Sequence, residues 1–520
     1  MASVLPATTF YSGDSGLKLI SALEAIDHPG RPFELDLPHV GRQPVPFVDP
    51  MVVVHGDHAH PLQSPLFPPL SAPFIAAFGA RGAYLLPALA FVALVPLLAS
   101  ARRHLTPDAS WAVLAWIVVA ANPLLLYALE FWEHAPAVAL LAAGTAIVAP
   151  SFVRDLSAAR LAAGGALVGA GVLLRPEGAW YAVGLALALG PRRWLPFGGG
   201  AAALLLPAGV LNYRHFGTPL GAHASAVLAP IGSALWLATR WQRVLDWLWP
   251  AAAADAIGLT LVAAACVAAL FKVEVRVRQA LALAGTAVIA VLAARRALPM
   301  QSFWQGFPLA LLALMPASIC TPAAKGLGLA AYVAVVGVVL TATNDGGAQW
   351  GTRYLLIAAP PLLLLAARGA TDAAGTGAWR PARLALLAVI LLAGAAVSRS
   401  AYLELRGTKR NYEGLVTATR TFTRPGDVIL TNLWWFDQVN AALHGTRTFL
   451  YAADGAAAAR ALATLRAERI DAVTLAWSAD AAESPFPLES ALVGTCFRTR
   501  ATRDAEPRSI RFAAAQCAAE

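Results

Sequence analysis

The chain has 520 residues, of which 58% are hydrophobic and only 13% are charged, and its mean hydropathy is +0.61. A soluble protein of this length would cover several domains with charged surface, so the composition predicts an integral membrane protein. The net charge of +9 comes without a Lys/Arg run or a basic patch interleaved with aromatic residues, which excludes a typical nucleic-acid-binding protein.

Twelve apolar stretches are long enough, or nearly so, to cross a bilayer, and their many small residues suit close helix packing in lipid. Basic residues concentrate in alternate loops, starting with the loop after the first stretch, and this bias predicts that those loops are cytoplasmic. The segments 1–81, 212–251 and 343–353 and the tail after 398 are then on the outer side. The predicted spans are 82–100, 109–127, 135–150, 160–174, 177–190, 195–211, 252–271, 279–294, 304–319, 326–342, 354–367 and 382–398.

The outer N-terminal segment needs a signal for export. Residues 1–12 have neither a basic region nor an apolar stretch that could serve as a signal peptide. We therefore expect a further helix upstream of Met1.

Three outer segments have distinct patterns. Residues 14–26 repeat apolar side chains on one helical face, which predicts an amphipathic helix along the membrane surface. The Pro- and His-rich stretch that follows, up to Pro73, is expected to be loop. Four tryptophans between 236 and 249 lie among charged residues and predict a second interfacial helix. The segment 344–353 is expected to be a short Gly-containing loop.

Beyond residue 400 the composition becomes that of a soluble α/β domain. The pattern predicts a strand within 426–435, a helix over 456–470 and a strand over 471–477. This domain has no Gly-rich phosphate loop, so nucleotide binding is not indicated. Cys496 and Cys517 flank an expected terminal hairpin, and the sequence leaves open whether they form a disulfide.

Residues suited to chemistry gather on the predicted outer side in five groups. Their motifs are YSGDSGLKL with Asp14 and Lys18, EFWEHAP with Glu130, Glu133 and His134, HGDHAHP with His58 and His60, LRPEG with Arg175 and Glu177, and QWGTRYL with Arg353.

Each group also has an interpretation without catalysis. In this interpretation Asp14 caps a helix, as aspartate often does. Glu130 and Glu133 are then solvated residues at the membrane interface, and Arg175 and Arg353 extend to the lipid headgroups. The histidines of the third group are metal-ligand types, but their spacing matches no established site. The sequence therefore predicts no metal site, although it leaves a divalent cation open.

Carboxylates and cations on one side of a membrane suit group transfer from an anionic lipid-linked substrate. Arg and Lys would hold phosphate, and a carboxylate would take the proton of an attacking hydroxyl.

These motifs, with NYRHFGTPLG and WGTRYLLIAAPPLLLL, resemble the GT-C superfamily of membrane glycosyltransferases. The similarity is to the family 39-like members, which include protein O-mannosyltransferases and lipid A aminoarabinose transferases, and it covers about residues 10–370. It implies an all-α polytopic membrane domain of the GT-C type over 1–400 and a soluble α/β domain over 401–520. It also implies a bacterial cytoplasmic membrane, with the active site and the C-terminal domain on its outer side.

The resemblance further implies a hexosyl or pentosyl transferase that moves a sugar from a polyprenyl-phosphate donor to a glycan, lipid or protein acceptor, without another cofactor. Asp14 would be the general base, and Glu133 or Glu130 would orient the acceptor or the base. Two departures from the family pattern are that Ser15 follows Asp14, where adjacent acids are common, and that the preceding helix is missing. Substrate contacts are expected from Lys18, Arg353, His134, Arg175, Glu177, His58 and His60.

Other functions remain open from the sequence. They are a transporter or flippase of a lipid-linked or small polar substrate, an oligosaccharide ligase, and a scaffold whose C-terminal domain binds a partner. The interiors of the predicted spans contain no ionisable side chain, which disfavours ion-coupled transport.

Overall fold

The computed structural model describes most of the chain, and the statements below concern this part only. The described residues are 5–41, 43–55, 58–221, 236–248, 274–295, 303–314, 321–342, 353–375, 380–480, 486–505 and 509–517, with isolated positions between 257 and 264. The predicted span 252–271 and the loop 344–352 therefore lie essentially outside the described residues.

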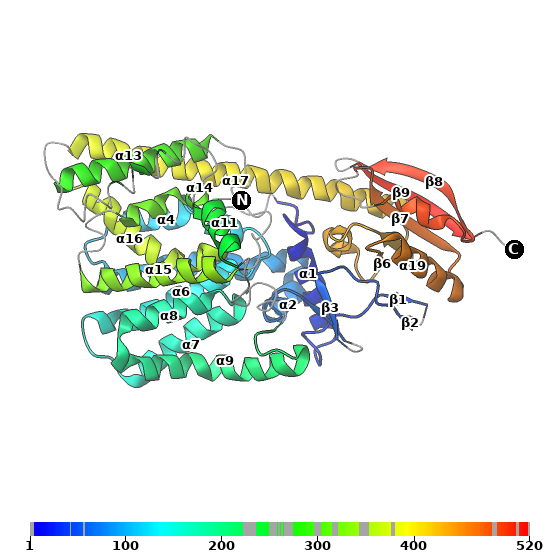
Figure 1. Ribbon diagram of the computed structural model, residues 1–520, viewed down its shortest axis with the longest axis horizontal. Coiled ribbons are helices and arrows are strands. Elements are labelled where there is room, and N and C mark those ends of the chain that lie inside the picture. Colours follow the sequence, from blue (N-terminus) through cyan, green and yellow to red (C-terminus); the bar gives the residue numbers. More distant parts are fainter. Residues whose placement is uncertain are drawn as a thin grey trace. The chain divides into compact units, whose positions relative to one another are not determined.

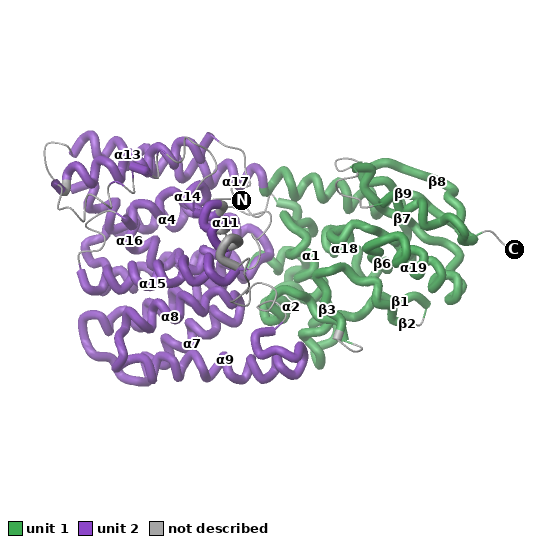
Figure 2. Tube along the Cα trace, in the orientation of Figure 1, with its two compact units in different colours: residues 1–85, 405–520 green, residues 86–404 purple. Residues whose placement is uncertain are grey.

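The chain forms two compact units (Figure 2), and the residues before the first long helix belong with the C-terminal part. Unit 1 contains Met1–Leu85 and Leu405–Glu520, and unit 2 contains Leu86–Glu404. By compactness the chain therefore divides elsewhere than at the expected boundary of residue 400, and the first outer segment is not part of the helical unit. The boundary of the membrane domain itself stays a prediction.

Unit 2 is helical. Its elements in the described chain are α3 (Leu85–Leu105), α4 (Trp111–Ala120), α5 (Leu124–Ala128), α6 (His134–Val148), η3 (Ala149–Phe152), α7 (Ala158–Leu174), α8 (Gly178–Leu189), η4 (Pro191–Arg193), α9 (Trp194–Phe216), α11 (Trp236–Leu248), α13 (Val275–Ala294), α14 (Phe303–Gly306), η5 (Pro308–Leu314), α15 (Pro322–Thr341), η7 (Arg353–Ala358), α16 (Ala359–Ala373) and the first part of α17 (Arg380–Phe422), whose residues from Leu405 on belong to unit 1.

The helices of unit 2 pack against one another (Figure 1), and glycines lie at several of their contacts. A Cβ atom on Gly144 of α6 would overlap the Val168 side chain of α7, and one on Gly165 of α7 would overlap the backbone of Phe197 in α9. Any larger side chain would push the helices apart. This is the packing expected where the lipid supplies no hydrophobic driving force between helices.

The helices of the described chain also have the exterior of a membrane protein. Seven helical segments of the described chain are long and apolar enough to cross a bilayer, and large apolar side chains such as Leu195, Leu206 and Leu392 are exposed on their surfaces. The protein is therefore a multi-pass membrane protein. The seven segments are Phe67–Leu105, His134–Phe152, Pro191–Phe216, Arg276–Ala294, Pro322–Thr341, Arg353–Ala373 and Arg380–Phe422.

Predicted spans differ from the structure in detail, as 109–127 and 382–398 show. The span 109–127 is broken between α4 and α5, where Asn122 donates from Nδ2 to the oxygen of Ile117 at 3.0 Å and accepts at Oδ1 from the nitrogen of Leu124 at 2.8 Å. Asn122 thus satisfies backbone groups at both helix ends, and Pro123 cannot donate to a continuous helix. The span predicted to end at 398 continues as α17 to Phe422.

The N-terminal part of unit 1 contains the predicted helix, although residues 15–22 are all buried, whereas an amphipathic surface helix would expose one face. The predicted helix forms α1 (Gly13–Asp27), which packs against α2 (Phe67–Phe78). The stretch up to Pro73 has more regular structure than expected: it contains the hairpins β1–β2 (His39–Val40, Gln43–Pro44) and β3–β4 (Val52–His55, His58–Pro61), and α2 begins within it. The turn η2 (Gly79–Tyr84) completes this part.

The C-terminal part of unit 1 is the predicted α/β domain. Its sheet has the order β6-β5-β7-β9-β8, in which β6, β5 and β7 are parallel and β9 and β8 form an antiparallel hairpin (Figure 1). The elements are β5 (Val428–Thr431), α18 (Phe436–Val439), η8 (Ala441–Leu443), β6 (Thr448–Tyr451), α19 (Gly455–Ala467), β7 (Ala472–Ser478), η9 (Leu488–Leu492), β8 (Phe497–Ala505) and β9 (Ile510–Cys517).

Alternating strand residues cover both faces of this sheet. Leu430 and Leu475 pack with Leu462 of α19, whereas Ile429 and Phe512 pack on the other face with the end of α17. A disulfide joins Cys496 to Cys517, which settles the question that the sequence leaves open. The two predicted strands and the predicted helix are present as β5, β7 and α19, but the sequence analysis missed the parallel strand β6 that precedes α19.

Candidate functional site

An ion triad lies at the ends of three helices in unit 2. Arg175 follows the last residue of α7 and donates from Nη1 to Oε1 of Glu133 at 2.9 Å and from Nη2 to Oε1 of Glu177. Glu133 precedes α6 and Glu177 precedes α8, where the helix N-termini favour negative charge. The three side chains are at most 4% exposed. The guanidinium therefore bonds two carboxylates in a water-poor site.

Tyr354 brings a second arginine to this triad. The Cζ atom of Arg175 lies 5.3 Å from the Tyr354 ring centroid, and the Cζ atom of Arg353 lies 5.5 Å from it. Both cations thus approach one ring at a distance typical of cation–π contacts. The formal charges of the two carboxylates and the two guanidinium groups cancel, so burying the four groups together costs less free energy than burying any one of them alone.

Glu130 and His134 border the triad in sequence. Glu130 is fully buried and His134 is 2% exposed. The His134 ring stacks near Tyr127 and Trp132, with centroids 4.8 and 5.6 Å away. The EFWEHAP motif therefore forms a buried turn that packs against aromatic side chains. Its two glutamates are not solvated interface residues.

Asp14 lies in unit 1, in the first turn of α1. Gln63 donates from Nε2 to Oδ1 of Asp14 at 3.4 Å, and a helix N-terminus favours negative charge at this position. Lys18, one turn later, is 1% exposed. The predicted base thus lies in a partly buried but polar setting, which suits a proton acceptor.

A carboxyl pair that the sequence analysis missed lies close to Asp14. Asp49 is 2% exposed and is hydrogen-bonded to Asp437. Burial, and to a smaller extent the Asp14 charge, raises the pKa of Asp49 to about 6. Burial and the Asp49 charge raise the pKa of Asp437 as well. Unit 1 therefore holds three carboxyl groups near one another.

The same unit buries a cation that the sequence did not indicate. Lys409 of α17 is fully buried and donates from Nζ to the hydroxyl of Tyr84 at 2.8 Å. Its Nζ lies 4.4 Å from the Tyr84 ring centroid and 5.6 Å from that of Phe10. No local motif marks Lys409 or Asp437, because the partners of each come from the opposite end of the chain. The apolar neighbours of Asp437 could have suggested its burial, but Lys409 is flanked by polar and charged residues.

The two predicted histidines of the third group have different environments. His58 is exposed, with Nδ1 3.0 Å from Oε2 of Glu34, while His60 is 2% exposed, with Nδ1 3.0 Å from the oxygen of Phe33. These contacts organise the hairpin and the loop before it. Asp57 lies outside the described residues.

Within each unit the structure brings several predicted residues together. Glu133, Arg175, Glu177 and Arg353 meet in unit 2, although they come from separate helix ends that are distant in sequence. Asp14 and Lys18 share a helix in unit 1. The roles of all these residues in binding and catalysis stay predictions.

Comparisons with known proteins give a structural likeness alone. No family model matches the chain, and no curated protein matches it in sequence. The crystal structure of ArnT from Cupriavidus metallidurans bound to undecaprenyl phosphate has a TM-score of 0.53 and 13% identity, and the match covers 99% of this chain and 95% of that chain. The apo structure of the same protein has a TM-score of 0.54, with the same identity and coverage. The chain therefore has the GT-C fold, a helical membrane part followed by a soluble α/β part, as the sequence resemblance predicts.

Proposed function

We propose that this protein is a membrane glycosyltransferase that transfers a sugar from a polyprenyl-phosphate donor to an acceptor hydroxyl. The observation that carries the proposal is the full-length GT-C fold, shared with a protein whose structure contains undecaprenyl phosphate. Fold alone does not assign function, so the proposal also needs residues able to perform the reaction.

Those residues have distinct parts in the proposed reaction. The acceptor oxygen attacks the anomeric carbon while the bond from that carbon to the phosphate oxygen breaks. The acceptor proton passes to the carboxylate of Asp14, and polyprenyl phosphate leaves with the bonding electrons. A single displacement of this kind inverts the anomeric centre. Because phosphate is a good leaving group, one base suffices, unlike the carboxyl pair of glycoside hydrolysis.

The cations divide between binding and positioning. Arg353 is proposed to contact the donor phosphate, since a guanidinium matches phosphate geometry. Arg175 already bonds two carboxylates, so we assign it to holding Glu133 in place for the acceptor. Lys18 is proposed to supply further positive charge near Asp14. The proposed reaction requires no metal and no cofactor besides the lipid-linked donor.

The proposed location is the outer face of a bacterial cytoplasmic membrane. The disulfide between Cys496 and Cys517 supports an oxidising compartment for unit 1, and the basic residues of the alternate loops support the same orientation.

A donor panel tests this function. The purified full chain is incubated with radiolabelled undecaprenyl-phosphate hexoses and pentoses, with the corresponding nucleotide sugars in parallel, and membranes lacking the protein supply acceptors. We expect transfer of label from a lipid-phosphate donor and none from the nucleotide sugars, with inhibition by added undecaprenyl phosphate as product. Movement of an intact donor across sealed vesicles without any transfer would instead indicate a flippase.

A further inference from the structure

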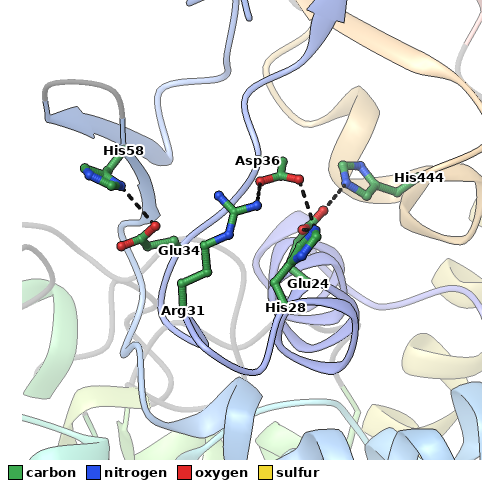
Figure 3. Close-up of polar contacts among 7 residues, drawn as sticks. All are labelled: Glu24, His28, Arg31, Glu34, Asp36, His58 and His444. Carbon is green, nitrogen blue, oxygen red and sulfur yellow. Dashed lines mark hydrogen bonds and ion pairs between the residues drawn. The ribbon is translucent and has the colours of Figure 1, made fainter.

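At the far end of α1, away from Asp14, unit 1 gathers side chains of the types that bind zinc (Figure 3). Glu24 lies in the last turn of the helix, His28 follows four residues later as its C-terminal cap, and Asp36 comes from the loop that follows. One ligand atom from each residue lies within 4.8 Å of the other two. His444, from the loop before β6, approaches the same group.

We propose that Glu24, His28 and Asp36 bind a divalent cation of the zinc class. Nε2 of His28 lies 3.3 Å from Oδ2 of Asp36 and 3.8 Å from Oε2 of Glu24. Four ligands at about 2.0–2.1 Å from a tetrahedral zinc ion are about 3.3 Å from one another. Small side-chain adjustments would therefore let the three atoms share one ion.

The neighbouring groups fit outer contacts of such a site. Oε1 of Glu24, its other oxygen, lies 3.3 Å from Nε2 of His444, and Oδ1 of Asp36 accepts from Nη2 of Arg31 at 2.6 Å. Each carboxylate thus has one oxygen directed at His28 and the other held by a second residue. Partners of this kind orient metal ligands and tune their affinity.

The cluster is accessible to a hydrated ion. The side chains of His28 and Asp36 are 42% and 35% exposed, and Glu24, Asp36 and His444 line a cavity of about 350 Å³. An ion bound here would cross-link the C-terminal end of α1 to the loop after it, and through His444 to the α/β domain. Its role is structural, and it is separate from the proposed sugar transfer.

Nothing in the sequence indicates this site, because His444 belongs to the C-terminal domain and the spacing of the other three residues matches no metal motif. The histidines weighed as ligands from the sequence, including His58, belong to a different hairpin. His58 offers a matched control, since it too is an exposed histidine 3.0 Å from a glutamate oxygen.

Calorimetric titration with Zn²⁺ tests the proposal. The full chain is purified in detergent with a tag that contains no histidine, stripped with a chelator and titrated, alongside His28→Ala, Asp36→Asn and His58→Ala. We expect one saturable Zn²⁺ per wild-type chain, at least tenfold weaker binding in the first two variants, and unchanged binding in His58→Ala. Visible absorption of bound Co²⁺ should be lost in the same two variants.

A folding defect is distinguished by the melting temperature without metal. All three substitutions are at partly exposed side chains and should leave this temperature unchanged, while Zn²⁺ should raise it for the wild type and His58→Ala only. Absence of saturable binding by the wild type, or equal affinity in His28→Ala and His58→Ala, would overturn the proposal and leave the cluster as ordinary ion pairs.

Discussion

At the scale of single residues, the carboxyl pair of Asp49 and Asp437 makes unit 1 sensitive to pH. The usual pKa of an aspartate is 3.8, but the pKa of Asp49 in the folded protein is about 6. Between these values the folded state binds more protons than the unfolded state, so the stability contributed by this group falls as the pH rises. This loss becomes complete once the pH is well above about 6.

Asp49→Asn removes this penalty, because the amide stays neutral. We expect the variant to melt as the wild type does at pH 4 and to be more stable at pH 7.5, by at most about 3 kcal/mol for a shift of about two pH units. Thermal unfolding in detergent at both pH values measures the difference. Asp27→Asn, at an exposed position of the same unit, is the control. A stability difference between Asp49→Asn and the wild type that is the same at pH 4 and pH 7.5 would contradict the account.

At the scale of elements, α1 is held by close contact with α18. A Cβ atom on Gly16 would overlap the backbone oxygen of Gln438, whereas one on Gly13 would overlap only the end of the Gln438 side chain. A side chain can rotate away, but a backbone oxygen moves only with its element. Substitution of Gly16 by a larger residue should therefore be tolerated less well than substitution of Gly13.

Gly16→Ala should lower the stability of unit 1 by about 1–3 kcal/mol through overpacking. Helix propensity alone would give the opposite sign, since alanine favours helices over glycine by about 1 kcal/mol. Gly13→Ala should cost less, and Gly30→Ala, with nothing within 4 Å of the new atom, should leave the melting temperature unchanged. Equal melting of Gly16→Ala and Gly30→Ala would rule out the close contact.

The ends of α6, α7 and α8 depend on Arg175. Replacing it by methionine leaves Glu133 and Glu177 buried without their cation, which typically costs about 3–5 kcal/mol. We expect Arg175→Met to melt well below the wild type, and the triple variant with Glu133→Gln and Glu177→Gln to recover much of the loss. Asp155→Asn, which removes an exposed partner of Arg193, should have no effect.

If the triple variant regains stability, the loss in Arg175→Met comes from the uncompensated charges of Glu133 and Glu177. If it does not, the loss comes from the packing that the arginine side chain provided. If Arg175→Met melts like Asp155→Asn, the triad does not hold the helix ends together.

At the scale of the whole molecule, the hydrophobic periodicity and the composition of the sequence were sufficient to predict the fold class. The long apolar runs, the helix α1 and the elements β5, α19 and β7 follow from patterns no longer than a single element, whereas the strand β6 was missed. The resemblance added the GT-C type, which the structural likeness confirms.

The sequence could not show which distant residues meet. Asp49 pairs with Asp437, and Phe10 and Tyr84 enclose Lys409, because residues before Leu85 pack with residues after Leu405. No local pattern encodes such contacts. By contrast, Glu133, Arg175 and Glu177 could be grouped in advance, because each lies at a predicted span end on the same side of the membrane.

The most direct test of the proposed function is the transfer rate of Asp14→Asn with the donor identified in the panel. Asp27→Asn, on the same helix, is the matched control, and equal melting temperatures establish that both variants fold. A general base contributes typically about 10²- to 10⁴-fold, so we predict at least a hundredfold loss in Asp14→Asn and wild-type transfer in Asp27→Asn. Transfer by Asp14→Asn within a few-fold of the wild type would contradict its assignment as the base and direct attention to Glu130 and Glu133.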